Sequence, residues 1–89
     1  MKLSGEYVIR EFNDVIYAVP TGETADKLGG AIRINASCRV LWEALMQGTT
    51  KEGLVKALLN RYDIDAAVAE KDVEEFISKI KEARLTEEN

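Results

Sequence analysis

The fold is decided by residues 31–62, which read AIRINASCRVLWEALMQGTTKEGLVKALLNRY. The first four residues, Ala31 to Ile34, place an isoleucine on each side of an arginine, and this alternation predicts a short strand with both isoleucines on one face. Asn35 or Ser37 then caps a helix, because either side chain accepts hydrogen bonds from the free N–H groups of a first helical turn. The apolar stripe of this helix consists of Val40, Leu41, Trp42, Leu45 and Met46. A strand that leads directly into an amphipathic helix is therefore the centre of the predicted fold.

Two further helices are predicted downstream. Thr49 and Glu52 have the spacing of a capping box, in which the hydroxyl and the carboxylate each accept a hydrogen bond from a free backbone N–H. The apolar stripe of the helix that follows consists of Leu54, Val55, Leu58, Leu59 and Tyr62. Asp65 is the expected N-cap of the last helix. The stripe of that helix consists of Ala69, Val73, Phe76, Ile77 and Ile80. We expect Leu85 to close the core and Thr86–Asn89 to fray.

The N-terminal third predicts a β-hairpin. Residues 7–12 and 15–19 are rich in β-branched and aromatic side chains, and the Asn-Asp pair at 13–14 tolerates the geometry of a tight turn. Pro20 ends the second run, because proline cannot donate to a strand ladder. The polar stretch Thr21–Gly30 closes with two glycines and is expected to be a loop.

The resulting element order is β-β-β-α-α-α. It predicts an α+β fold of winged helix-turn-helix-like outline, in which a three-stranded antiparallel sheet is followed by three helices in one two-layer core. The whole chain, residues 1–89, is expected to form a single domain with its core over about 7–85. The aromatic residues expected in the core are Trp42, Tyr62 and Phe76. Tyr7 and Tyr17, on the hairpin, are expected to be half-exposed.

Composition excludes several classes of function. The chain has 16 Asp and Glu against 12 Lys and Arg, a net charge of −4, and no histidine. The lack of histidine removes the commonest metal ligand and the commonest general base, so we expect no enzyme, no cofactor and no metal site. Cys38 is expected to be a small buried side chain, because no histidine is present to activate a thiol.

The sequence also indicates the cellular compartment of the protein. No apolar run approaches the ~20 residues that a membrane span needs. Charges interrupt the N-terminal stretch too early for a secretory signal. The single cysteine fits a reducing compartment, so a cytoplasmic protein is expected without a membrane partner.

A winged-helix outline raises the possibility of DNA binding. From Asp65 to Arg84 the sequence has six acidic and four basic residues. The preceding helix has Lys51, Lys56 and Arg61 against Glu52, which makes a thin cationic patch. Since phosphate contacts supply most of the affinity for DNA, we expect no nucleic-acid partner. An acidic winged-helix transcriptional regulator or adaptor remains the alternative function.

The edge of the sheet is the stronger candidate site. A small open sheet leaves strands with unpaired N–H and C=O groups, and the strand Ala31–Ile34 is a candidate edge. An extended peptide can pair with such an edge through main-chain hydrogen bonds and needs no catalytic residue to do so. A blunted edge without a partner is equally compatible with the sequence.

Six short motifs follow one another along the chain. They are Ile32-Arg33-Ile34-Asn35, Val40-Leu41-Trp42-Glu43, Gly48-Thr49-Thr50, Leu58-Leu59-Asn60-Arg61-Tyr62, Asp72-Val73 and Phe76-Ile77. Together, over roughly residues 7–85, they resemble the PqqD family. PqqD is the small protein of pyrroloquinoline quinone biosynthesis, and its relatives are the peptide-recognition elements of pathways that make ribosomally synthesised, post-translationally modified peptides.

The resemblance implies a non-catalytic domain that binds the leader segment of a precursor peptide. The leader would add to the third strand, in a groove shared with the third helix, and be presented to a modifying enzyme, often a radical S-adenosylmethionine (SAM) enzyme. Carried onto this chain, the peptide-binding residues would be Ala31, Ile32, Arg33, Ile34, Asp72, Phe76 and Lys79. A homodimer through the same sheet edge stays open. The net charge favours a basic partner surface or a leader with some cations.

Overall fold

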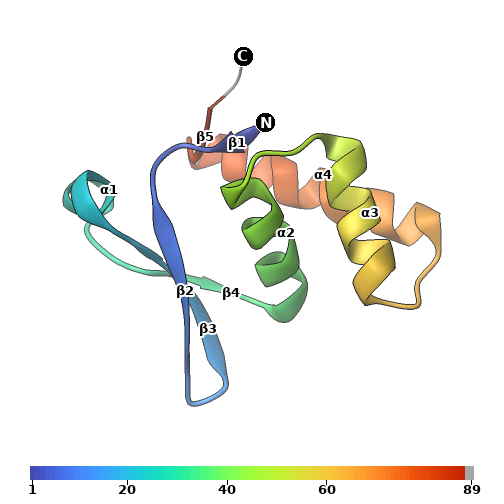
Figure 1. Ribbon diagram of the computed structural model, residues 1–89, viewed down its shortest axis with the longest axis horizontal. Helices are drawn as coiled ribbons and strands as arrows, with labels where there is room; N and C mark the ends of the chain where they lie inside the picture. The colour runs from blue at the N-terminus through green and yellow to red at the C-terminus, as the bar shows by residue number, and fades with distance from the viewer. Residues whose placement is uncertain (88–89) are drawn as a thin grey trace.

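The structure is a computed structural model that describes residues 1–87. Its elements in chain order are β1 (Lys2–Leu3), β2 (Tyr7–Phe12), β3 (Val15–Pro20), α1 (Gly22–Leu28), β4 (Ile32–Ile34), α2 (Ala36–Met46), α3 (Lys51–Arg61), α4 (Ala66–Glu82) and β5 (Thr86–Glu87). Strands β2, β3 and β4 form an antiparallel sheet to one side of helices α2, α3 and α4 (Figure 1). The predicted α+β class is confirmed, with four helices in the described part of the chain where three were expected.

The hairpin forms where it was predicted. Phe12 pairs with Val15, so the turn contains only Asn13 and Asp14, and both have a positive φ (50° and 64°). Two consecutive left-handed residues give the tight turn whose twist matches that of the flanking strands. Strand β3 ends at Pro20, as expected.

The sheet has an inner and an outer face. The inner face is marked by Tyr7 and Ala18, which are 4% and 0% exposed, and by Ile9, Ile32 and Ile34, which pack against the core. Successive side chains of a strand point to opposite faces, so the residues between them lie on the outer face. The sheet therefore buries one face against the helices and leaves the other without a helical layer.

Trp42 lies at the centre of the core and is 2% exposed. The centroid of its ring lies 5.2 Å from that of Tyr7, with an interplanar angle of 89°, and 6.4 Å from that of Phe76, with an angle of 71°. Both pairs are edge-to-face. Aromatic pairs prefer this geometry. The core assignment is confirmed for Trp42 and Phe76, and Tyr62 packs half-buried at its margin. The half-exposed position expected for Tyr7 is wrong, because its strand directs it at the tryptophan.

The helix stripes are mostly as predicted. Ala69, Val73 and Ile80 of α4 are buried, and so is Leu85, which closes the core at 7% exposure. Leu59 and Met46 were placed on apolar stripes, but they are 37% and 43% exposed. Each lies one position beyond a fully buried leucine, Leu58 or Leu45. A step of one residue turns a side chain about 100° around a helix, which takes these two to the margin of the buried face.

Asn35 is the cap of α2. Its Oδ1 accepts from the Cys38 N–H at 2.8 Å and from the Ser37 hydroxyl at 3.0 Å, so Ser37 supports the cap and does not form it. The predicted capping box at Thr49 is wrong by one residue, since Thr50 Oγ1 accepts from the Gly53 N–H at 3.0 Å.

Two other end contacts differ from expectation. The backbone N–H of Thr49 donates to the carbonyl of Met1 at 2.9 Å, which ties this connection to the N-terminus. Asp65 occupies the N-cap position of α4, as predicted, but its side chain makes no capping hydrogen bond.

The expected loop Thr21–Gly30 contains the helix α1, so that expectation is wrong. Residues 23–28 include no glycine or proline, and Gly29 ends the helix with φ 74° and an N–H that donates to Ala25 at 2.9 Å. The helix is held by a tertiary contact: Thr24 Oγ1 accepts from the Glu6 N–H at 3.0 Å. Sequence analysis could not supply this partner, which lies 18 residues away.

The two termini pair with each other. Strand β1 runs antiparallel to β5, with Lys2 opposite Glu87 and Leu3 opposite Thr86, and Leu3 is 4% exposed. The expected fraying is therefore wrong for Thr86 and Glu87, whereas residues 88–89 lie outside the described part. In that part, no helix has both the length and the apolar character needed to cross a membrane.

Candidate functional site: the edge of β4

Strand β4 ends the sheet order β2-β3-β4. Its inner neighbour is β3, with Ile32 opposite Ala18, Arg33 opposite Tyr17 and Ile34 opposite Ile16. Within residues 1–87 no strand pairs with its other side. Such an edge presents unpaired N–H and C=O groups to an incoming chain. Ala31, which was predicted to belong to this strand, lies immediately before it and is exposed.

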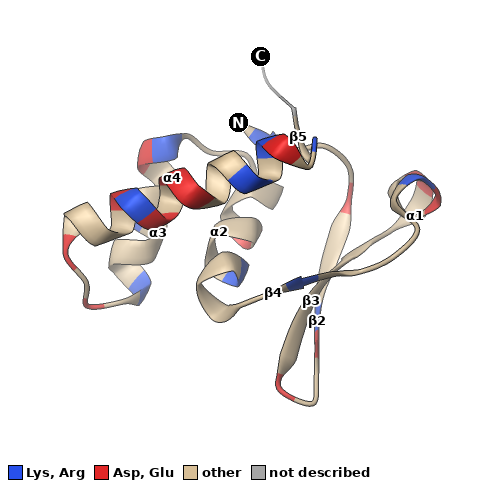
Figure 2. Cartoon of the chain, turned by 180° about the vertical axis from the view of Figure 1, so that it is seen from behind, with Lys and Arg blue, Asp and Glu red and all other residues tan. Residues whose placement is uncertain are grey.

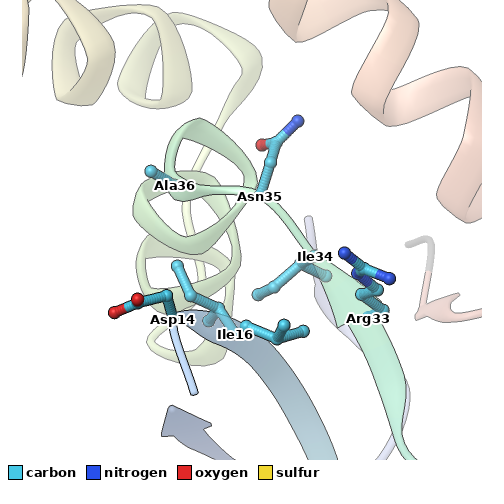
Figure 3. A pocket seen from close by; sticks show the side chains of 7 residues that line it. Asp14, Ile16, Arg33, Ile34, Asn35 and Ala36 are labelled. Atoms are coloured by element: carbon cyan, nitrogen blue, oxygen red, sulfur yellow. The ribbon is translucent and has the colours of Figure 1, made fainter. Parts of the chain in front are cut away.

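The side chains of β4 alternate as expected. Ile32 and Ile34 are half-buried against the core, and Arg33 is exposed. In Figure 3 the side chains of Ile34 and Arg33 extend to opposite sides of the strand. An added strand would therefore contact the two isoleucines on the core side and the arginine on the other.

A hollow of about 410 Å³ lies where β4 leaves the sheet and turns into α2 (Figure 3). Its lining residues come from the hairpin turn and from this connection: Asp14, Val15, Ile16, Arg33, Ile34, Asn35 and Ala36. The hollow forms because β3 extends one residue beyond its last pair with β4, so that Val15 has no partner in β4. It lies between the start of β3 and the segment that leads from β4 into α2.

A second hollow, of about 350 Å³, brings α4 to the same connection. It is lined by Asn35, Ala36, Ser37, Leu58, Tyr62, Ile64 and Asp72. Asp72 is thus the one helical residue of the predicted site that shares a cavity with the connection between β4 and α2. The sequence analysis missed Tyr62 and Ile64 as lining residues, because it assigned Tyr62 to the core. Tyr62 directly follows the last residue of α3, and this position at a helix end was the available signal.

The other two predicted helical residues lie differently. Phe76 is only 6% exposed and packs on Trp42, so it supports the site from the core. Lys79 is exposed in the last turn of α4. It lies seven positions after Asp72, about 10 Å along the helix axis. Asp72, in the middle of α4, and Lys79, in its last turn, therefore do not form a single cluster.

The cationic patch considered for DNA is weaker in the structure than in the sequence. Lys51 Nζ lies 3.6 Å from Glu74 Oε1, so an acidic residue of α4 accompanies one of its three cations. Among the described residues, no group of three or more Cys, Asp or Glu side chains is arranged to hold a metal ion. Burial raises the pKa of the Tyr7 hydroxyl above its ordinary value near 10, and this hydroxyl donates to the carbonyl of Ser4 at 3.5 Å.

Comparison with known proteins agrees with these features. The fold is similar to that of a solved structure, TbiB1 in complex with the TbiA(beta) leader peptide, with a TM-score of 0.72 and 21% identity over 100% of this chain and 98% of that chain. No curated protein sequence matches the chain. Residues 15–85 match the family described as Coenzyme PQQ synthesis protein D (PqqD). The resemblance drawn from the six motifs is thereby confirmed, and the chain belongs to the PqqD family.

Proposed function

We propose that this protein binds the leader segment of a ribosomally synthesised precursor peptide as an added strand on β4, and that it does so without catalysing a reaction. The observation that carries the proposal is the open side of β4 beside the hollow that contains Asp72. Strand addition takes affinity from main-chain hydrogen bonds and specificity from pockets for alternate side chains. Membership of the PqqD family and the likeness to a leader-bound structure support the same reading.

The chemistry of the edge suggests what the leader contains. Ile32 and Ile34 offer partly exposed apolar surface, and the hollow at Asp72 adds Leu58, Tyr62 and Ile64. Apolar leader side chains would be buried there. Arg33 offers a cation to an acidic leader residue, and Asp72 offers a carboxylate to a basic one. A leader that carries both signs of charge around an apolar centre therefore fits the site best.

The proposed role is that of a peptide chaperone. The loaded domain would present the leader to a modifying enzyme, such as a radical SAM protein, in the cytoplasm. Since the open edge belongs to a three-residue strand, it offers little to a second copy, and a homodimer through β4 would compete with the leader.

The test is an amide NMR titration of the labelled protein with the leader peptide of the precursor encoded at the same locus. The largest shifts are expected at residues 32–35 and at Asp72. A leader with scrambled sequence is the control for non-specific binding. Absence of shifts with the true leader, or shifts confined to α3, would remove the proposal, and shifts confined to α3 that require added DNA would favour the regulator.

A charge variant sharpens this test. Arg33→Glu is expected to weaken binding of a leader with acidic residues about fivefold, because it replaces attraction by repulsion at an exposed position. Lys56→Glu makes the same change of charge on the exposed side of α3 and is expected to leave the affinity within about twofold, since that charge is remote and screened. Equal losses in the two variants would show that only net charge is sensed.

A further inference from the structure

The outer face of the sheet carries a row of side chains of which the proposed leader site uses only Arg33. The strand register places Arg10 opposite Tyr17 and Tyr17 opposite Arg33, so the tyrosine lies between two arginines from the neighbouring strands. We define the outer sheet face by these three residues and by their neighbours on the same side, which are Val8, Phe12, Val15 and Val19.

This face is accessible and partly apolar. Phe12 is 70% exposed, the largest exposed fraction among the exposed large apolar residues of the described chain. Its strand partner Val15 and the central Tyr17 are half-buried, whereas Arg10 and Arg33 are exposed. Helices α2, α3 and α4 lie on the opposite side of the sheet (Figure 1). An aromatic and apolar centre with arginines at its sides has the composition of a protein-binding surface.

The charge of this face is opposite to that of the molecule. The chain has a net charge of −4, but the residues that β2, β3 and β4 direct to the outer side include two arginines and no acid. The acid of β2, Glu11, lies on the other face, where Arg39 of α2 approaches it at 3.7 Å. Figure 2 shows the contrast, since α4 carries both colours along its length and β4 carries only blue. A local patch of one sign selects a partner of the other sign.

A second copy of the chain is a poor partner for this surface. Two copies packed face to face would bring Arg10 and Arg33 of one against the same residues of the other. Like charges brought together across an interface cost several kcal/mol. The occupant that fits is therefore a different protein with an acidic surface.

We infer that the outer sheet face binds an acidic surface of the enzyme that modifies the bound peptide. The inference rests on the proposed function. A leader strand added to β4 would continue the sheet, and its alternate side chains would lie on the outer face beside Arg33. An enzyme docked there contacts the domain and the leader at once, which distinguishes the loaded domain from the empty one.

The test measures two affinities separately with the purified modification enzyme and the leader peptide encoded at the same locus. Arg10→Glu is expected to weaken enzyme binding about tenfold and to leave leader binding unchanged, because Arg10 lies on the strand farthest from the β4 edge. Lys56→Glu, with the same change of charge, is expected to leave both affinities within about twofold. Phe12→Ser removes apolar contact at a position exposed enough to keep the fold, and it is expected to weaken enzyme binding about fivefold.

The outcomes separate the inference from the proposed function. Failure of the wild-type protein to bind the leader overturns the proposed function. Normal leader binding together with equal enzyme affinity in Arg10→Glu and Lys56→Glu overturns only the docking inference. Loss in Arg10→Glu of binding to a single-stranded RNA oligonucleotide, or of self-association in sedimentation equilibrium, with enzyme binding unchanged, would also overturn it, in favour of a nucleic-acid surface or of a second copy.

Discussion

The two edge strands of the three-stranded sheet, β2 and β4, differ in length and in what lies beside their unpaired backbone groups. On β2, the guanidinium of Arg10 folds back and donates to the carbonyl of Ile9 at 3.0 Å. At the start of β2, the N–H of Glu6 donates to Thr24 of α1 at 3.0 Å and its carbonyl accepts from the Thr21 N–H at 3.0 Å, so this end of the strand is tied to the segment that follows β3. On β4, as on β2, no strand of the described residues pairs with the outer side, and β4 has three residues against six in β2.

This difference bears on which edge can pair with another chain. Charged side chains and covering segments are common ways to stop a strand edge from pairing with another chain. The longer strand β2 has the first of these, since Arg10 bonds the carbonyl of its own neighbour Ile9. Strand β4 has its short length, which limits pairing with a second copy, and two hollows lie at the connection that follows it.

The largest expected effect comes from proline at the open edge. The N–H groups of consecutive strand residues point to opposite sides, so of Ile32→Pro and Arg33→Pro one loses a bond to β3 and the other loses a donor on the open side. We expect the first to lower the unfolding temperature and the second to keep it while weakening leader binding more than about a hundredfold, because the ring also stands where the leader would lie. Thermal unfolding and fluorescence polarisation with the leader measure the two effects.

The matched pair on the β2 edge is Arg10→Pro and Glu11→Pro. One of these prolines is expected to keep the fold, and that variant should bind the leader as wild type does. A loss of leader binding in a folded β2 variant equal to that in the β4 variant would mean that the leader uses both edges or neither.

The next effect tests how α1 is held at the start of β2. Gly5 has φ 108°, and a methyl group on it would lie 2.5 Å from Thr24 Oγ1 and 2.8 Å from its Cγ2. Gly5→Ala combines backbone strain with this clash, so the free energy of unfolding should fall by about 2–3 kcal/mol in urea titrations. Gly29→Ala has the strain without the clash and should cost about 1–2 kcal/mol. Equal costs would show that the Thr24 contact does not hold α1 in place.

A smaller effect is expected at the junction of β4 and α2. Asn35→Ala removes the cap of α2 and should lower the free energy of unfolding by about 1 kcal/mol. Asn35→Ser should restore the cap but not the leader affinity, because Asn35 lines both hollows beside the open edge. If the serine variant recovers stability and affinity together, Asn35 serves only the helix.

The smallest effect concerns pH. Burial raises the pKa of Tyr7, so its neutral form is favoured in the folded state. The stability that this provides is complete below the unfolded pKa of about 10 and is lost as the pH rises through the folded value. Urea unfolding from about pH 8 to pH 11 should show this decline, and Tyr7→Phe should reduce it. An identical decline in the two proteins would assign it to other groups.

Local patterns in the sequence predicted most of the elements. The alternation in residues 31–34, the Asn-Asp pair at 13–14 and the apolar stripes of the three long helices each depend on neighbours within a few positions, and each appears in the structure. Helix α1 and the pairing of β1 with β5 were missed because their partners are distant: Thr24 holds Glu6, and the first strand pairs with the last. Short elements owe their stability to such contacts.

The candidate site was likewise predicted from the sequence only in part. The motifs Ile32-Arg33-Ile34-Asn35 and Asp72-Val73 indicated β4 and α4, and the spacing of Asp72, Phe76 and Lys79 suggested one shared face. In the structure Phe76 packs against Trp42 in the core, and only Asp72 shares a cavity with the connection between β4 and α2. The peptide-binding role of these residues remains a prediction for the titration above.

By itself the sequence determined the class of the protein: a small acidic α+β domain without histidine, of the PqqD family, whose turns, caps and stripes are local properties of the chain. Only the tertiary structure decided which strands form the edges of the sheet and which side chains meet beside β4. The physical reason is that an edge is defined by the absence of a neighbour, and neighbours in a sheet are set by contacts between residues far apart in the chain.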